Sequence, residues 1–385
     1  NGYFINTTDN ACTITLPSAA EAGDQIILAD YARNWATNAI TIDSNGLLFQ
    51  GETDAFIVDY DTNGQAVNLV YSGATVGWTP ASDIVSAFEP VAPVTQKGLF
   101  GFGEHSSRTS ITNLINSSGV VATDTAGVGT ARSVLAAATY GTDKGIIGYG
   151  TSPNTNLSNL VSNSGVVASD TTGVGSARLG LAAASYGGDK AIFGYGKTGS
   201  ITAITNLVGN NGVIASDTSG VGTPRNYVAA ASYGGDKALF GYGATGSADT
   251  TRSSLTNKVS NSGVVASDTT GVGTGRLLLA AAKYGGDKAV FGYGGYYDGS
   301  SMNLLSVTNL VSNTGVVSSD TSGVGTARRS LAATNYGGDK AIFGFGTGNT
   351  AVTNLVGNNG VVASDTSGVG TGRADLCAVG FSLSA

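Results

Sequence analysis

Arginine and aspartate recur six times each at matched positions, and they are the side chains with the clearest potential for chemistry. Six carboxylates on one ring could form a ligand site or a Ca²⁺ site. A residue that every repeat carries is more often structural, so we predict that each Arg pairs with an Asp or with backbone carbonyls, within or between repeats. The residues are Arg132, Arg178, Arg225, Arg276, Arg328 and Arg373, with Asp124, Asp170, Asp217, Asp268, Asp320 and Asp365.

The residues that break the repeat are better candidates for binding, and they lie in the segments of variable length. Exposed Tyr beside Asn, Asp and Arg suits contact with a sugar or a protein surface. Ordinary drift of loop sequences would leave the same pattern, and this alternative stays open. The candidates are Glu104, His105, Arg108, Asn154, Lys197, Asp249, Arg252, Tyr296, Tyr297 and Asp298.

Few side chains are suited to catalysis or to metal binding. Among 385 residues there are 59 Gly, one His, two Cys and only 12% charged residues. His105 has no second His and no nearby Cys, so we expect a surface residue rather than a base or a ligand. The Gly-rich G-V-G and F-G-Y-G segments lack the strand–loop–helix context of a phosphate loop. We therefore expect no enzyme, no cofactor and no metal.

Charge and hydropathy limit the classes of partner that the chain could bind. Residues 1–96 carry a net charge of −10 and residues 97–385 a net charge of +3. Neither half shows the basic stripe with interleaved aromatics that binds nucleic acid. No run of about 20 apolar residues occurs, so we expect no membrane insertion, and no signal peptide is visible. Cys12 and Cys377 lie far apart and form no disulfide framework; their redox state stays open.

One repeat unit fills residues 97–385. Its Arg always follows the T-N or S-N pair by 20 residues, as from Thr112 to Arg132, and always precedes the last Gly of F-G-Y-G by 18, as from Arg132 to Gly150. Only the segment after F-G-Y-G varies, from six residues (347–352) to 13 (295–307). A unit of fixed spacing with one segment of variable length indicates a repeat architecture in which the length variation is confined to one loop.

Each unit has room for four short antiparallel strands, which is typical of a β-propeller blade. L-A-A-x-x-Y and A-I-F-G-Y-G form one predicted hairpin around G-G-D-K, and T-N-L-V and G-V-V-x-S-D-T form another. The small residues of the first hairpin place it at the central axis. The first unit lacks its L-A-A strand, and residues 373–383 supply it. We therefore predict an all-β fold with a closed six-bladed propeller over residues 97–385.

The array resembles kelch repeats over about 290 residues. The matching elements are the Arg, the small-residue strand and the glycine-ended strand, as in R-R-S-L-A-A-T-N-Y-G-G-D-K-A-I-F-G-F-G (328–346). The Trp that kelch blades usually carry on the outer strand is absent. The resemblance implies a divergent, kelch-like six-bladed propeller.

Residues 1–80 show alternating strands at 11–16, 24–30, 39–43, 55–60 and 66–71, which predict a small β-sandwich-like domain. Residues 81–96 are predicted to be a linker, with a short helix at 82–88. The pattern T-I-T-L-P…A-G-D-Q-I-I-L-A-D-Y-A…W-A-T-N-A-I-T-I-D-S-N-G…V-N-L-V-Y…G-W resembles a β-module of bacteriophage tail-fibre and virion appendage proteins. The resemblance implies a virion structural protein, with this module as the attachment to other virion proteins.

These features lead to a hypothesis of a non-enzymatic virion appendage protein, external and extracellular on the particle. The module would attach or multimerise, so we expect a homo-oligomer, and the propeller would present a face to a host glycan or protein. A purely structural spacer remains one alternative, because the units are nearly identical. A hydrolase of surface polysaccharide remains another, although it needs two carboxylates facing the ligand and the propeller has one Glu, Glu104.

Overall fold

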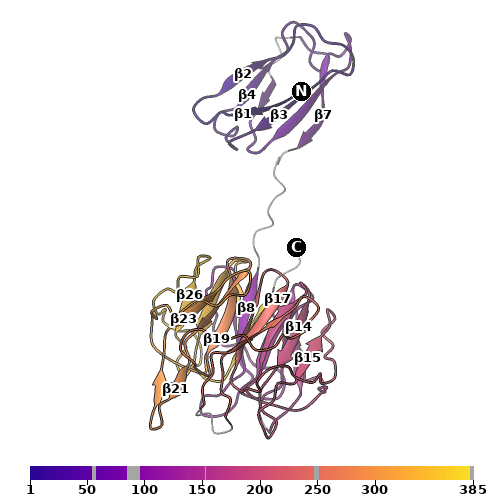
Figure 1. Cartoon of the computed structure of the whole chain (residues 1–385). Helices are drawn as coiled ribbons and strands as arrows, with labels where there is room; N and C mark the ends of the chain where they lie inside the picture. The colour runs from indigo at the N-terminus through magenta and orange to yellow at the C-terminus, as the bar shows by residue number, and fades with distance from the viewer. Residues whose placement is uncertain (54–57, 85–95, 152, 247–250, 382–385) are drawn as a thin grey trace. The chain divides into compact units, whose positions relative to one another are not determined.

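The computed structural model describes residues 1–53, 58–84, 96–151, 153–246 and 251–381, and every regular element in them is a β-strand (Figure 1). The chain divides into two compact units, residues 1–93 and residues 94–385. Gly, Thr, Ser and Val are abundant in the sequence, and these residues favour strands and turns. The prediction of an all-β protein is confirmed.

The first unit consists of two mixed sheets around one core. One sheet has the strand order β1-β3-β6-β7 and the other β2-β4-β5, with β1 parallel to β3 and β2 parallel to β4. The core between them contains Trp35, Trp78, Leu69 and Ile40. The strands are β1 (Gly2–Ile5), β2 (Cys12–Thr15), β3 (Gln25–Asp30), β4 (Ile40–Asp43), β5 (Val58–Tyr60), β6 (Ala66–Tyr71) and β7 (Trp78–Ile84).

Five predicted strands of this unit correspond to β2 through β6, but β1 and β7 were not predicted. The short helix expected at 82–88 is wrong for residues 82–84, because they belong to β7 and pair with β6; residues 85–88 lie outside the described part of the chain. Pro80 indicated a linker, yet it sits within β7 opposite Leu69. β7 is an edge strand, where a proline without a backbone N–H is tolerated.

The second unit contains six three-stranded antiparallel sheets with a common plan, and we call it the ring unit. The inner strands are β10 (Ala136–Tyr140), β13 (Ala182–Tyr186), β16 (Ala229–Tyr233), β19 (Ala280–Tyr284), β24 (Ala332–Tyr336) and β27 (Cys377–Phe381). The middle strands are β8 (Lys97–Gly101), β11 (Lys144–Gly148), β14 (Lys190–Gly194), β17 (Lys237–Gly241), β20 (Lys288–Gly292) and β25 (Lys340–Gly344). The third strands are β9 (Thr112–Ile115), β12 (Ser158–Val161), β15 (Thr205–Val208), β18 (Thr256–Val259), β23 (Thr308–Val311) and β26 (Thr353–Val356).

The predicted hairpin between inner and middle strands is confirmed. In the β13–β14 hairpin, Tyr186 pairs with Lys190 around a three-residue turn. Gly187 and Gly188 have φ angles of 62° and 81°, which a side chain would strain and glycine adopts freely. The G-G-D-K signal therefore fixes the turn and, with it, which strand residues face the core.

The predicted fourth strand is present only as isolated bridges. In the first sheet these bridges join Thr112 to Thr125 and Ile115 to Val121. The segment outside therefore spans one residue more than β9 does, which is a bulge. The Asn113 side chain fills the gap by donating to the carbonyl of Ala122 at 3.0 Å. The sheets are consequently three-stranded with a bulged outer segment, which is consistent with a propeller-like repeat.

The C-terminal strand completes the first sheet, as predicted. β27 pairs antiparallel with β8, so the strand order is β27-β8-β9 although 276 residues separate Gly101 from Cys377. The inner strands contact one another in cyclic order, with β27 between β24 and β10. The chain thus closes into a ring of six sheets, and the edge of β8 is covered.

A cycle of six backbone hydrogen bonds runs around the axis of the ring unit. The N–H of one residue in each repeat donates to the carbonyl of the matching residue in the preceding repeat, at 2.7 to 3.3 Å. The cycle contains Asp375, so it depends on the last repeat being in place. Its six members all have φ between 51° and 65°. They are Val134, Gly180, Tyr227, Leu278, Ser330 and Asp375.

Neighbouring sheets pack through a glycine and an aromatic ring. A Cβ added at Gly194 would lie 2.7 Å from Cζ of Phe240 in the next sheet, which is too close for carbon atoms. The same Phe240 ring packs at 5.1 Å from the Tyr195 ring. This contact recurs around the ring, so the glycines that end the middle strands allow neighbouring sheets to pack closely.

Gly194→Ala is expected to destabilise the ring unit by about 1 to 3 kcal/mol, the usual cost of an added carbon in a tightly packed core. Urea unfolding of the full chain, followed by tyrosine fluorescence, would measure it. Gly199→Ala is the matched control, because a Cβ there meets no atom within 4 Å. Equal stability of the two variants would contradict the packing account.

Candidate functional site

The ring unit has two different faces. The turn face carries the short turns between inner and middle strands, such as residues 187–189. The variable-loop face carries the connections from middle to third strands, such as residues 295–307. β8 begins at Lys97, which pairs with Phe381 at the end of β27, so the chain enters and leaves the ring on the turn face. Figure 1 shows the β21–β22 hairpin projecting from the opposite end of the ring.

The repeated arginines are buried between adjacent sheets. Arg178 is fully buried; its Nε donates to the carbonyl of Tyr195 at 3.0 Å and its Nη2 to Oδ1 of Asn206 at 2.6 Å. Its guanidinium also lies 4.4 Å from the centre of the Tyr149 ring, which belongs to the preceding sheet. Burial lowers the pKa of Arg178, and the partners compensate for the lost hydration. The contacts of Arg178 are therefore with the fold itself.

Each repeated aspartate links the bulged outer segment of its sheet to the loop that precedes the inner strand of the same sheet. Oδ2 of Asp217 accepts hydrogen bonds from the Ser176 hydroxyl at 2.6 Å and its backbone N–H at 3.1 Å, and Oδ1 accepts from Asn206 at 2.9 Å. Oδ1 also lies 3.9 Å from Nη1 of Arg178. The aspartates are therefore occupied by the fold. Sequence reasoning missed the Asn of T-N, which joins the Arg to the Asp in five of the six repeats, although its six-fold recurrence was visible.

Acid is expected to weaken the ring unit. Burial raises the pKa of Asp217, but the hydrogen bonds from Ser176 and Asn206 outweigh it and hold this pKa below the usual 3.8; the same holds at the five equivalent aspartates. Their contribution to stability is complete above pH 3.8 and is lost as the pH falls through the lower folded values. Urea midpoints should fall steeply between pH 4 and pH 2, and the fall should be shallower in Asp217→Asn. A midpoint independent of pH in that range would contradict the expectation.

Three predicted binding residues in the first variable loop mainly hold that loop in place. Glu104 lies 3.7 Å from Arg108 and accepts a hydrogen bond from the Ser133 hydroxyl at 3.1 Å. Nδ1 of His105 lies 2.8 Å from the carbonyl oxygen of Gly372. His105 and Arg108 remain exposed. The loop is therefore ordered by its own side chains and presents two basic groups.

Two further predicted residues lie in neighbouring loops. Nδ2 of Asn154 donates to the carbonyl of Thr198 at 3.1 Å and so joins the second and third variable loops. Lys197 pairs through its backbone with Leu179 and Ile201. Asp249 lies outside the described residues.

The longest variable loop forms a hairpin, β21 (Gly295–Tyr297) and β22 (Met302–Leu304). Its turn is held by Asp298, which accepts hydrogen bonds from the backbone of Ser300 and Ser301 and from Nδ2 of Asn303 at 2.8 Å. These bonds, the one from Asn303 foremost, place the pKa of Asp298 well below its usual value. Asp298 therefore shapes the hairpin and remains charged.

Arg252 and Tyr296 meet across two loops. The Arg252 guanidinium stacks over the Tyr296 ring at 3.8 Å from its centre, and it comes from the loop of the preceding sheet. Arg252 is exposed, and the adjacent Tyr297 is 37% exposed. A stacked guanidinium keeps its edge N–H groups for a carboxylate or hydroxyl, while an exposed tyrosine offers a flat apolar surface. Arg252, Tyr296, Tyr297 and Asp298 thus come from two neighbouring variable loops and form a composite surface.

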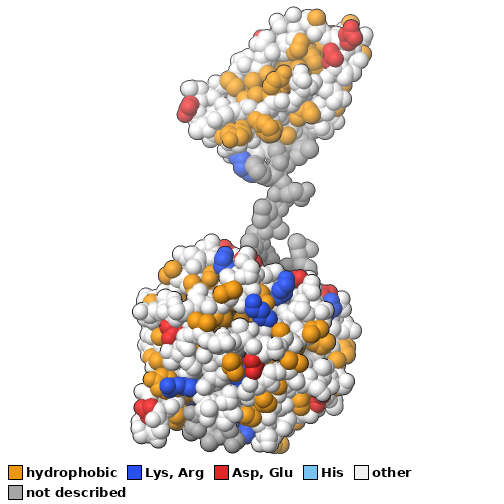
Figure 2. All heavy atoms as spheres, in the orientation of Figure 1, with side chains coloured by type: hydrophobic (Ala, Val, Ile, Leu, Met, Phe, Trp, Pro, Cys, Tyr) orange, Lys and Arg blue, Asp and Glu red, His pale blue; other side chains and the backbone are white. Residues whose placement is uncertain are grey.

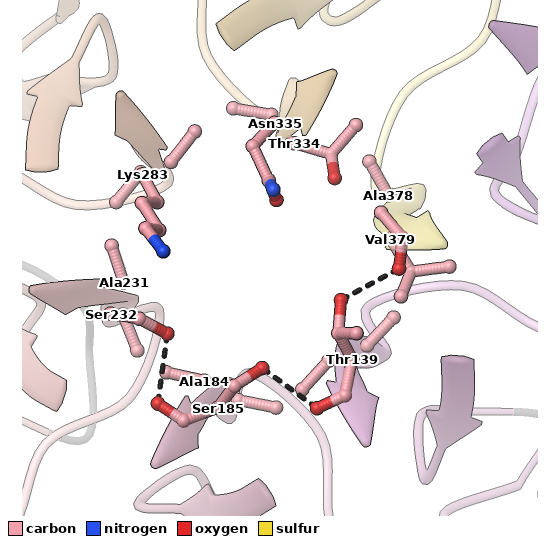
Figure 3. Close-up of a pocket in the computed structure, with 18 residues that line it drawn as sticks. Thr139, Ala184, Ser185, Ala231, Ser232, Lys283, Thr334, Asn335, Ala378 and Val379 are labelled. Atoms are coloured by element: carbon pink, nitrogen blue, oxygen red, sulfur yellow. Dashed lines mark hydrogen bonds between the residues drawn. The ribbon is translucent and has the colours of Figure 1, made fainter. Parts of the chain in front are cut away.

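A second feature, which sequence reasoning missed, is the channel along the axis. The six inner strands line it with three residues each, mostly alanine (Figure 3). Lys283 projects into it from β19, where the other repeats carry Thr139, Ser185, Ser232, Asn335 and Gly380. Near the variable-loop face, burial raises the pKa of Asp375 against a hydrogen bond from Ser330. Alignment of the repeats could have revealed both residues, because each breaks an otherwise neutral position.

Charged side chains are sparse on the surface seen in Figure 2. Within the described residues, no three His, Cys, Asp or Glu side chains gather as a metal site would require. In the same residues, no helix is long and apolar enough to cross a membrane. Cys12 and Cys377 are free thiols.

The chain matches no protein-family model and no curated protein.

Proposed function

We propose that this chain is a non-enzymatic recognition protein of a virion appendage, whose variable-loop face binds a glycan or protein on a host surface. One observation carries the proposal. The length variation of the repeats is confined to the face opposite the one where the chain enters and leaves the ring at Lys97 and Phe381. A face that can vary without disturbing the sheets is suited to changing its ligand.

The Arg252–Tyr296–Tyr297 surface is the proposed contact on that face. Tyrosine gives a large contact area at low cost in side-chain entropy, and arginine donates several hydrogen bonds in fixed directions. The anchoring of Asp298 to Asn303 at 2.8 Å holds the hairpin before any ligand arrives. Less ordering is then needed on binding, which favours affinity.

The setting on a phage particle rests on the resemblance of residues 1–80 to tail-fibre modules, as the six-bladed, kelch-like description rests on the repeat. The first unit exposes Phe4 by 80% and Tyr31 by 65%, with their rings 6.4 Å apart. Phe4 lies in β1, an edge strand of its sheet. Exposed aromatics at a sheet edge suit attachment to another virion protein or to a second copy.

The test is binding of the full chain to a glycan array and to host cells. We expect Arg252→Ala with Tyr297→Ala to abolish binding, while Lys237→Ala, on the turn face, leaves it unchanged. Binding that survives the double substitution would move the site elsewhere. No binding at all, with the ring unit enclosed by other proteins in images of the particle, would favour the spacer. Release of reducing sugar that is lost in Glu104→Gln would favour the hydrolase.

A further inference from the structure

The channel residues nearest the turn face form two unlike halves. One half carries hydroxyls that donate to the preceding strand: Thr139 to the carbonyl of Gly380 at 2.6 Å, Ser185 to Thr139 at 2.7 Å and Ser232 to Ser185 at 2.8 Å. A hydroxyl has one hydrogen, so each of these oxygens can now only accept a further hydrogen bond. We call the turn-face end of the channel its mouth. In this half of the mouth the three hydroxyl oxygens, which we call the hydroxyl wall, can only accept hydrogen bonds.

The other half carries donors. Figure 3 shows the side chains of Lys283 and Asn335 pointing into the space that the hydroxyls border. Neither the Lys283 ammonium nor the Asn335 amide forms a hydrogen bond or ion pair with the described part of the chain. The carboxylate of Asp287 attracts Lys283 only at longer range. In the absence of a ligand, their hydrogens are left to water.

Lys283 is an unusual residue to place there. It is half-buried among alanines, and this burial lowers the pKa of its ammonium. A serine or threonine would fit the same position, as Thr139, Ser185 and Ser232 show in other repeats. A half-buried charge without a counter-charge is unfavourable for the fold, which points to a ligand that supplies the counter-charge.

The mouth has the size of a small polyatomic ion. A cavity of about 120 Å³ lies between Gln96, Thr139, Ser185, Ser232, Lys283 and Asn335. A cavity of this size has room for several waters or one compact anion.

We propose that this mouth binds a phosphate group. Two phosphate oxygens accept from the Lys283 ammonium and the Asn335 amide, and the P–OH of hydrogenphosphate donates to the hydroxyl oxygens of Ser185 or Ser232. Sulfate has the same shape but no hydrogen to donate, so it satisfies only the donor half. The site lies on the turn face and does not depend on recognition by the variable loops.

The test is calorimetric titration of the full chain with inorganic phosphate at pH 7 and constant ionic strength, alongside sulfate and glycerol phosphate. We expect saturable binding of phosphate that is weakened roughly tenfold or more in Lys283→Met, as loss of a charged hydrogen bond predicts. Lys237→Met is the control, because it removes the same charge from the same face but from a residue already paired with Asp236 at 2.7 Å.

Each outcome decides the proposal or its detail. Equal weakening by both substitutions, or no saturable binding, would overturn the site. Sulfate binding as tightly as phosphate would overturn the role of the hydroxyl wall. Glycerol phosphate at pH 7 is mostly the dianion, which has no P–OH, so it should bind as weakly as sulfate; binding as tight as that of phosphate would likewise overturn the role of the hydroxyl wall. The carbon NMR signals of Lys283 should shift on titration, which a purely structural lysine would not show.

Discussion

A chain that ends at Asp375 is expected to lose the cooperative fold of the ring unit. The missing residues 376–385 contain β27, of which Leu376, Cys377, Val379 and Phe381 are at most 6% exposed. Burying four such side chains contributes roughly 6 to 12 kcal/mol. That range is comparable to the whole net stability of a domain, about 5 to 15 kcal/mol. The truncated chain would also expose the edge of β8 and should associate with other copies.

The truncation has a direct rescue experiment. A synthetic peptide of residues 374–385 should restore a single unfolding transition, because it supplies the strand that pairs with β8. The same peptide with Val379→Asp should not, since it would place a charge where Val379 is 2% exposed. A truncated chain that unfolds in urea at the midpoint of the intact chain would show that β27 is not needed to hold the ring.

Arg178→Met is expected to lower the free energy of unfolding by about 3 to 5 kcal/mol, which is the usual effect of removing one partner from a buried ion pair. Methionine fills much of the space but leaves Asn206 Oδ1 and the Tyr195 carbonyl without their donor, and Asp217 without its nearby charge. Urea unfolding of the full chain measures the loss.

Two variants make this result specific. Lys190→Met removes a charge whose side chain is 44% exposed and whose partner Asp189 is at 3.0 Å, so it should change stability by less than about 0.5 kcal/mol. Arg178→Met combined with Asn206→Leu should cost more than Arg178→Met alone, because the Ala215 carbonyl and Asp217 then also lose the hydrogen bonds that Asn206 donates. A loss of less than about 1 kcal/mol in the free energy of unfolding for Arg178→Met alone would contradict the view that this arginine stabilises the contact between adjacent sheets.

The repeat was predictable because its motifs are short segments of sequence that recur six times. Fixed spacing located the strands, the G-G-D-K turn located the hairpins, and the unpaired last strand indicated that β27 joins β8. The bulged outer segment was not predictable in detail, since it depends on Asn113 replacing a backbone donor to Ala122. β7 was missed because a proline such as Pro80 is not expected within a central strand, and nothing in the neighbouring sequence showed that β7 is an edge strand.

The candidate sites were predictable only in part. Loop variation led to Arg252, Tyr296 and Tyr297, but the stacking of Arg252 on Tyr296 at 3.8 Å depends on which sheets are neighbours. The channel depends on the closed ring, so Lys283 looked like an ordinary strand residue. The carboxylate of Asp298 looked available for a ligand and instead holds its own hairpin, which spacing alone could not reveal.

The most direct test of the closed ring is the reactivity of Cys377 in a Cys12→Ser chain. Cys377 lies in β27, is 4% exposed, and burial raises the pKa of its thiol to about 12. If β27 closes the ring, a thiol reagent can label it only when the ring opens. Labelling should then be at least about a thousandfold slower than in the unfolded chain, and should accelerate with urea as steeply as global unfolding does. Labelling at the rate of an exposed thiol, or with little dependence on urea, would contradict closure by this strand.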